Sequence, residues 1–239
     1  MKLSNTTIFL AMITANIFAL YWGGYHTLMP ILYISGLALT SVIYGWMSLR
    51  MKTRDLMVLT SVSIIVAFID EYSHTVAEAF TYFDRMQPSP LTVFGWGLFI
   101  PVILTLAQHL YEKISLEKLL NNIPRIAPAI ISILMLIICI WTQNYFFILL
   151  QFPLALVYIF LVVSSLIYTS QQKPGWNTLV MIISLVTSAL MEFIGAMEGM
   201  WTFHFNEPLQ FFLLFTWTLR TWTILAVASI LGVELHKPE

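Results

Sequence analysis

Residues 177–203 of this chain of 239 residues read NTLVMIISLVTSALMEFIGAMEGMWTF, an apolar run interrupted by the carboxylates Glu192 and Glu198. A helix needs roughly 20 apolar residues to cross the core of a bilayer, so this run predicts a membrane-spanning helix. Charged groups inside such a helix are costly and mark a functional site by default. We therefore expect a helical membrane protein whose few buried charges carry its chemistry.

The composition supports this interpretation. Hydrophobic residues make up 59% of the chain and charged residues only 10%, whereas a typical soluble domain has roughly 25% charged residues. A soluble globular protein is therefore excluded. The net charge of −1 argues against a nucleic-acid partner, and the single cysteine, Cys139, excludes a disulfide within the chain.

The breaks between apolar runs define the expected spans, each of which should be a helix because hydrocarbon offers no hydrogen-bond partners. We predict eight spans: 5–22, 28–49, 56–82, 91–111, 126–142, 145–170, 177–203 and 209–234. The expected fold class is an all-α polytopic membrane protein. Its predicted parts are a first four-helix half (1–111), a cytoplasmic amphipathic linker (112–125) and a second four-helix half (126–239). The first run is interpreted as a retained helix rather than a cleaved signal peptide.

The distribution of Lys and Arg predicts the orientation, because cytoplasmic loops carry the positive excess. Of the 11 basic residues, Arg85 falls on the outer side of an eight-span chain and Arg220 within the last span. The others fall on one side: Lys2, Arg50, Lys52, Arg54, Lys113, Lys118, Arg125, Lys173 and Lys237. We expect an integral protein of the cell membrane with both termini in the cytoplasm.

An internal repeat relates the two halves at an offset of 121 residues. The matched pairs are Glu71 with Glu192, Ser63 with Ser184, Thr81 with Thr202, Tyr82 with Phe203, Phe94 with Phe215 and Trp96 with Trp217. Both glutamates lie about 15 residues, or roughly 22 Å, from the cytoplasmic ends of their spans. Chance similarity between two apolar segments is the alternative, but the shared depth of the two charges favours a duplication.

The ionisable residues inside the expected spans are few. They are Asp70, Glu71, His74 and Glu78 on the third span, Glu192 and Glu198 on the seventh, and Arg220 on the eighth. Positions 71, 74 and 78 share one helical stripe, from which Asp70 is offset. A structural interpretation also stands, in which Glu192 pairs with Arg220, and Glu78 and Glu198 reach the outer interface.

A carboxyl group buried in hydrocarbon favours its neutral form unless a cation holds it ionised, and a buried acid suits proton donation. Glu71 and Glu192 are the leading candidates for proton donor or base. His74 and Glu78 would tune or relay protons, and Arg220 would hold one carboxylate ionised. Asp70 and Glu198 are further catalytic candidates. Desolvated aromatic faces stabilise cations by about 0.5–2 kcal/mol each. The candidate lining residues are Tyr82, Trp96, Trp201, Phe203 and Trp217, although an interfacial aromatic belt would place similar residues there.

The segments that contain the two repeated glutamates resemble a known family. The run from Glu192 to Phe203, followed by Pro208-Leu209 and Trp217, resembles the membrane carotenoid hydratases of bacterioruberin and related pathways. Those proteins carry an acidic helix, a Gly-x-Trp-x-aromatic element, a Pro-Leu pair and a downstream tryptophan. The first half carries a similar set, namely Glu71, Thr81-Tyr82, Pro90-Leu91 and Trp96.

Residues 208–215 are also similar to the Pro-Leu-Glu-Glu-Phe-Leu-Phe-Phe element of small membrane lycopene cyclases, with Gln210 and Phe211 where the cyclases carry glutamates. The resemblance implies carotenoid chemistry without a redox cofactor, by protonation of a carbon–carbon double bond followed by hydration or cyclisation. It implies a lipid-soluble polyene as substrate and membrane lipid as surroundings. Association with other membrane enzymes stays open.

Two other classes of function remain. Glu71-x-x-His74 has the spacing of carboxylate-bridged metal sites in helical bundles, and with Glu78 it would form a metal-dependent hydrolase site near the outer face. Alternatively, the buried charges would serve a transporter, a receptor or an accessory membrane subunit, since charges near the middle of the membrane also fit transporters.

Overall fold

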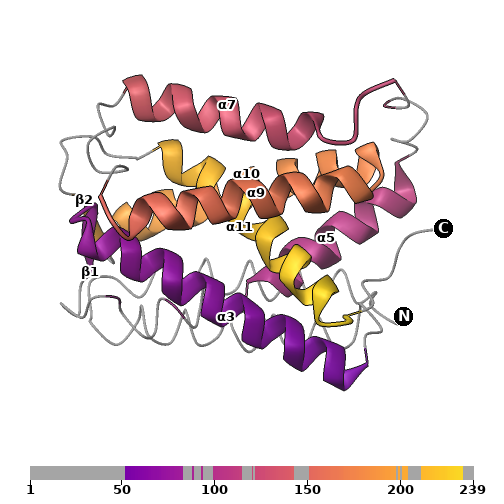
Figure 1. The fold of residues 1–239 in the computed structure, drawn as a ribbon, viewed down its shortest axis with the longest axis horizontal. Coiled ribbons are helices and arrows are strands. Elements are labelled where there is room, and N and C mark those ends of the chain that lie inside the picture. The colour runs from indigo at the N-terminus through magenta and orange to yellow at the C-terminus, as the bar shows by residue number, and fades with distance from the viewer. Residues whose placement is uncertain are drawn as a thin grey trace, which may run out of the picture.

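The computed structural model describes residues 52–82, 99–114, 122–142, 151–197, 201–203 and 211–233, together with residues 88, 93, 120 and 199. Most of the helices in this part run along the long axis of the molecule (Figure 1). The elements are α3 (Thr53–Val76), β1 (Phe80–Tyr82), α5 (Ile100–Lys113), α7 (Ala127–Thr142), α9 (Leu154–Gln171), α10 (Pro174–Met197), β2 (Trp201–Phe203) and α11 (Phe211–Ile230).

Four of the described helices, α3, α9, α10 and α11, are long and apolar enough to cross a membrane. Helix α7 is apolar but shorter, with 16 residues, and α5 has 14. The chain is thus an integral membrane protein by the length and composition of these helices. The six helices of the described part do not support the predicted count of eight spans or the two four-helix halves. The expected spans 5–22 and 28–49 lie outside the described residues.

Helix α11 forms the centre of the bundle and packs against α3, α7, α9 and α10. Its most apolar window is 78% buried, against 44–50% for the three other long helices. Those helices keep exposed apolar side chains, such as Ile65 on α3 and Phe193 on α10, as expected for a surface in contact with lipid. A charged residue on α11, in contrast, lies inside the protein.

Helix α3 ends six residues earlier than predicted, at Val76 rather than 82. The backbone amide of Ala79 donates to the carbonyl of His74 at 3.0 Å, and that of Glu78 donates to Thr75 at 3.1 Å. This is a Schellman cap, in which Glu78 takes the left-handed conformation with φ of 55°. The prediction that Glu78 shares a helical stripe with Glu71 and His74 is therefore wrong, because the helix stops before it.

The end of α10 corrects the seventh predicted span in the same way. The helix stops at Met197, and Gly199 has a positive φ of 67°. Trp201 and Phe203 then lie in strand β2 rather than in a helix. A short sheet thus departs from the expected all-α fold. Pairing of the two strands gives hydrogen-bond partners to backbone groups that follow the helix ends and no longer belong to a helix.

The two strands pair antiparallel, with Phe80 opposite Phe203, Thr81 opposite Thr202 and Tyr82 opposite Trp201. The offset of 121 residues found in the sequence relates both ends of α3 to both ends of α10, and both ends of β1 to both ends of β2. The same offset relates the pair Phe80–Phe203 to the pair Trp201–Tyr82. The ladder is therefore symmetric about the central pair, Thr81 and Thr202. Two segments of the same shape therefore meet at their ends, as Figure 1 shows for the strands.

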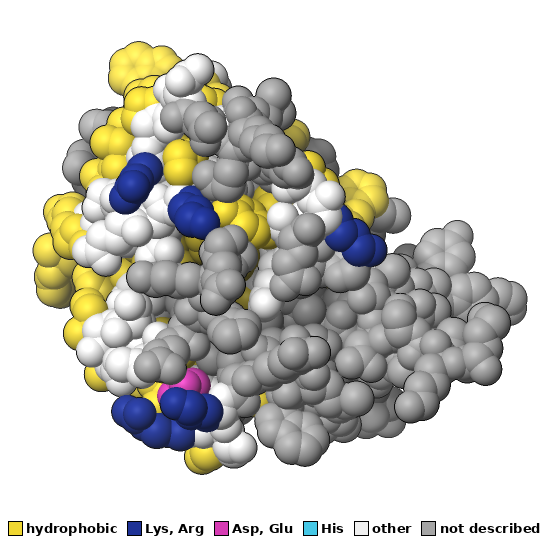
Figure 2. All heavy atoms as spheres, turned by 90° about the vertical axis from the view of Figure 1, so that its right-hand side faces the viewer, with side chains coloured by type: hydrophobic (Ala, Val, Ile, Leu, Met, Phe, Trp, Pro, Cys, Tyr) yellow, Lys and Arg dark blue, Asp and Glu magenta, His cyan; other side chains and the backbone are white. Residues whose placement is uncertain are grey.

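Several basic side chains lie on one end of the molecule, and acidic atoms are visible there beside one group of them (Figure 2). The described basic residues other than Arg220 are exposed and adjoin helix ends or the turns between helices: Lys52, Arg54, Lys113, Arg125 and Lys173. This arrangement agrees with the expectation that these five residues share one side. The predicted placement of both termini in the cytoplasm concerns residues outside the described part.

Candidate functional site

A buried charge cluster joins α3 to α11. Arg220 Nη2 donates to Asp70 Oδ2 and, at 2.9 Å, to Glu71 Oε1. The three residues are 2%, 0% and 4% exposed. Buried charges are tolerated when they are paired and hydrogen bonded, and here one guanidinium serves two consecutive carboxylates. The alternative pairing of Arg220 with Glu192 is wrong, and Asp70 belongs to the cluster despite its offset from the predicted stripe.

Strand β1 supplies a second contact to Glu71. The hydroxyl of Tyr82 donates to Glu71 Oε2, so each oxygen of this carboxylate has a donor. Burial, reinforced by the neighbouring carboxylate, raises the pKa of Tyr82 well above its usual range. The hydroxyl therefore keeps its proton and remains a donor. Tyr82, expected as a lining residue, also positions Glu71.

Glu192 on α10 has a different environment. Trp217 Nε1 donates to Glu192 Oε1 at 3.0 Å, and the side chain is buried. Among the described residues Glu192 forms no ion pair. The Trp217 ring also lies beneath Arg220, with the guanidinium carbon 4.2 Å from the ring centroid. Trp217 thus separates the second glutamate from the cation that holds the first.

His74 has contacts at both ring nitrogens and at the face of its ring. Its Nδ1 lies 2.8 Å from the carbonyl oxygen of Asp70, and its Nε2 lies 3.1 Å from the hydroxyl of Tyr158 on α9. The ring stacks against Phe80 and Phe212 at centroid distances of 6.0 and 6.2 Å. Tyr158 in turn lies 2.9 Å from Thr216 Oγ1 on α11. Such a network fixes the orientation of the imidazole.

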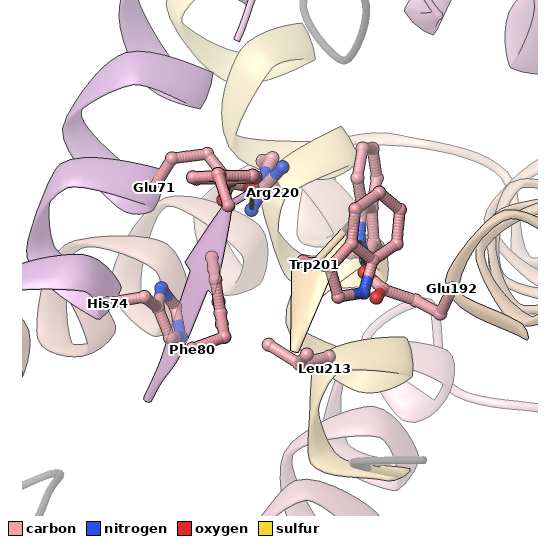
Figure 3. A pocket seen from close by; sticks show the side chains of 9 residues that line it. Glu71, His74, Phe80, Glu192, Trp201, Leu213 and Arg220 are labelled. Carbon is pink, nitrogen blue, oxygen red and sulfur yellow. Dashed lines mark hydrogen bonds and ion pairs between the residues drawn. The ribbon is translucent and has the colours of Figure 1, made fainter. Parts of the chain in front are cut away.

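These side chains line a small cavity with about 10 Å³ of space for water-sized spheres, enough for about one water molecule. Figure 3 shows Glu71 and Arg220 together at one side of the cavity, and Glu192 beside Trp201 at the other. Seven residues that the sequence predicted for the site line it, and Asp70 contacts Arg220. The full lining is Glu71, His74, Phe80, Tyr82, Glu192, Trp201, Leu213, Trp217 and Arg220.

Other predicted residues do not join this group. Glu78 is exposed and does not line the cavity. The set Glu71, His74 and Glu78 therefore does not come together, and the described residues contain no group of three or more His, Cys, Asp or Glu side chains placed to hold a metal ion. Glu198 and Trp96 lie outside the described residues, as does the side chain of Phe203.

Sequence reasoning missed Phe80, Leu213, Tyr158 and Thr216. The two hydroxyl residues sit within apolar spans, where Tyr and Thr occur for many reasons. One signal was available, because Thr216 lies four residues before Arg220 and thus on the same face of the same helix. The partners Tyr158 and His74 are 84 residues apart in the chain, and only the packing of α9 against α3 brings them together.

Trp201 fills a space that a glycine leaves open. A Cβ atom on Gly195 would lie 1.9 Å from Trp201 Cη2, so no larger residue fits beneath the indole. The repeat pairs Gly195 with His74, and Trp201 with Phe80. In the first half, the Phe80 ring therefore packs on the His74 imidazole. In the second half, the larger Trp201 indole packs on the backbone of Gly195.

Comparison with models of protein families, with curated protein sequences and with solved structures found no match to this chain. The cavity presents two carboxyl groups, an imidazole and several aromatic side chains, inside a bundle of helices long and apolar enough to span a membrane. Such a set can donate a proton, accept one and stabilise a transient cation.

Proposed function

We propose that the protein is an integral membrane enzyme that acts on a long apolar polyene, such as a carotenoid, by acid-type protonation of a carbon–carbon double bond. The observation that carries the proposal is that two carboxyl groups face one cavity in unequal surroundings. Glu71 has a cation and a phenol as partners, whereas Glu192 has one indole N–H. Pairs of acids in unequal environments divide the roles of acid and base between them.

Glu192 serves as the proton donor, because a desolvated carboxyl group without a cation favours its neutral form. Its proton passes to one carbon of the double bond, whose π electrons form the new C–H bond and leave a carbocation on the neighbouring carbon. Glu71, held as a carboxylate by Arg220, accepts the proton released when water adds or when an adjacent C–H bond breaks. Each turnover then leaves one proton to be returned to Glu192.

The rings around the cavity support this chemistry. Phe80, Tyr82, Trp201 and Trp217 present faces that attract a cation. The space in the cavity, about 10 Å³ for water-sized spheres, is that of about one water molecule. The reacting end of a polyene therefore enters only when the lining side chains move apart.

The proposal includes eight spans in two similar four-helix halves with both termini in the cytoplasm. It is supported by the offset of 121 residues, which holds at every boundary of α3, β1, α10 and β2. The gathering of the described basic side chains at one end also supports it (Figure 2). Cysteine labelling at positions 2 and 237 from either side of the membrane tests the topology.

Expression of the chain in a polyene-producing host, followed by pigment analysis, tests the activity. We expect a new product with the native chain, and a loss of at least about 100-fold for Glu192→Gln, since general acid–base catalysis contributes roughly 10²–10⁴-fold. Phe193→Leu, on the exposed face of α10, is the matched control and should keep the activity. A product that forms equally well with Glu71→Gln and Glu192→Gln, at normal protein levels, would exclude the acid mechanism.

A transporter, receptor or accessory subunit is the second candidate, because the pairing of Arg220 with Asp70 and Glu71 also locks α3 to α11. For this class the same host would show no new pigment from correctly inserted protein. The variants Glu71→Gln and Glu192→Gln would then change binding or assembly instead of product formation.

A further inference from the structure

A chain of hydrogen bonds leads from His74 through α9 to α11. It runs from His74 Nε2 to the Tyr158 hydroxyl at 3.1 Å, from there to Thr216 Oγ1 at 2.9 Å, and from Thr216 to the carbonyl oxygen of Phe212 at 3.1 Å. All three side chains are buried. The proposed acid–base roles assign nothing to Tyr158 or Thr216.

The direction of this chain depends on the charge of His74. The carbonyl oxygen of Asp70 can only accept a hydrogen bond, so His74 Nδ1 carries a proton in either state. When Nε2 is unprotonated, the Tyr158 hydroxyl donates to it, and Thr216 donates to Tyr158. When Nε2 is protonated, it donates to Tyr158, which donates to Thr216, which donates to Phe212.

Both arrangements use every donor, because each hydroxyl is both a donor and an acceptor. This chain of hydrogen bonds can therefore partner neutral imidazole and imidazolium equally well, because its two hydroxyl groups can reverse the direction in which they donate. This differs from a histidine locked by a partner that only donates or only accepts.

We propose that the chain from Tyr158 to Phe212 is a proton-directed switch that lets His74 change its charge beside the cavity, with Tyr158 and Thr216 as positioning residues. Asp70, Glu71 and Arg220 together carry a formal charge of −1. A neutral His74 leaves this charge uncompensated, which favours a transient cation in the cavity. An imidazolium cancels the charge and favours the resting state.

Several charged or titratable groups face this site. They are Asp70 and Glu71 on α3, Tyr82 on β1, Tyr158 on α9, Glu192 on α10 and Arg220 on α11. The two carboxylates of α3 favour the imidazolium and Arg220 opposes it. Substitutions at Tyr158 and Thr216 leave all of these formal charges unchanged, so they test the switch without altering the cluster.

The test needs no substrate. The chain labelled with ¹⁵N-histidine is placed in lipid nanodiscs, and NMR reports the protonation of His74 from about pH 5 to about pH 9. His74→Gln identifies its signals among the five histidines. In the native chain we expect both charge states within this range, each with Nδ1 protonated.

Thr216→Val should reduce the ratio of imidazolium to imidazole about tenfold at a given pH. The imidazolium state then leaves the Tyr158 hydroxyl without an acceptor, which is costly for a buried donor, whereas the neutral state keeps the bond to Nε2. Thr216→Ser retains the oxygen and should match the native chain. Tyr158→Phe removes the partner of Nε2 and should lower the ratio at least as much as Thr216→Val.

Equal ratios in the native chain, Thr216→Val and Thr216→Ser would overturn the switch, as would a His74 that stays in one charge state throughout. The effect of the switch on catalysis rests on the proposed function, but the charge states do not. An intact switch in a protein without polyene activity would therefore refute only the proposed function, and an absent switch with intact activity would refute only this inference.

Discussion

The segments α3–β1 and α10–β2 have the same lengths and the same glutamate, yet they place it in opposite surroundings. Glu71 is hydrogen bonded to Arg220 and Tyr82, whereas Glu192 has a hydrogen bond from Trp217 and no ion pair among the described residues. Around these two glutamates, the residues paired by the repeat differ in polarity. Asp70 matches Met191, His74 matches Gly195, and Arg220 matches Phe99.

The difference shows what a duplication can do at a buried site. Two equal acids facing one cavity would compete for one role, since like charges close together cannot both ionise. Polar neighbours gathered around one glutamate and apolar neighbours around the other separate the two roles. The asymmetry therefore lies in the residues that surround the repeated glutamates.

The test with the largest expected effect removes the cation that pairs with the carboxylates of α3. Arg220→Leu leaves Asp70 and Glu71 buried without their guanidinium partner, which should destabilise the protein by about 3–5 kcal/mol. Thermal unfolding in detergent, or the fraction of folded protein in the membrane, measures the loss. Arg220→Lys keeps the charge and should lose clearly less. An Arg220→Leu protein as stable as the native chain would mean that the ion pairs do not hold α3 to α11.

The second unit can be disrupted through its packing instead. Gly195→Ala places a methyl group within the Trp201 ring, and overpacking of this severity should cost about 3 kcal/mol. Trp201→Phe recreates the smaller ring of β1, so the double variant should recover much of the stability. If the double variant is no better than Gly195→Ala alone, the indole is not what excludes a side chain at this position.

Much of this site was predictable because charge is rare in the sequence. Only a few ionisable residues fall within apolar runs, so Glu71, His74, Glu192 and Arg220 were short-listed by elimination, and they meet at one cavity. The length of the apolar runs also indicated where the long helices α3, α9, α10 and α11 lie. In both respects the membrane limits which secondary structures and which polar residues can occur, because hydrocarbon offers no hydrogen-bond partners.

The pairing of these residues was not predictable in the same way. Arg220 meets Asp70 across 150 positions of the chain, and nothing local to either residue distinguishes this partner from Glu192. The ends of α3 and α10 were also missed, since an apolar segment reads alike as helix or strand. The break at Glu78 depends on a left-handed backbone conformation that a non-glycine residue rarely adopts.

A third test compares the two glutamates directly by their effect on stability. Glu71→Gln weakens charge-assisted bonds to Arg220 and Tyr82, so we expect a loss of about 2 kcal/mol. Glu192→Gln keeps an oxygen for the Trp217 N–H and should cost less than about 1 kcal/mol. Thermal unfolding of both variants decides the matter. Equal losses would show that the two environments differ less in energy than in geometry.

The smallest expected effect lies at the turns that lead into the two strands. Glu78 and Gly199 are related by the repeat, and both have positive φ, at 55° and 67°. Glycine adopts this conformation without strain, whereas other residues are disfavoured by roughly 1–2 kcal/mol. Glu78→Gly should therefore stabilise the protein, by about 0.5–1 kcal/mol after the greater freedom of glycine in the unfolded chain is deducted. Gly199→Glu should destabilise it by a similar amount, measured by thermal unfolding.

Opposite signs at the two positions would show that both helices end in the same cap, with the strain confined to the first copy. A loss of stability in Glu78→Gly would show that the glutamate side chain contributes more than its backbone conformation costs.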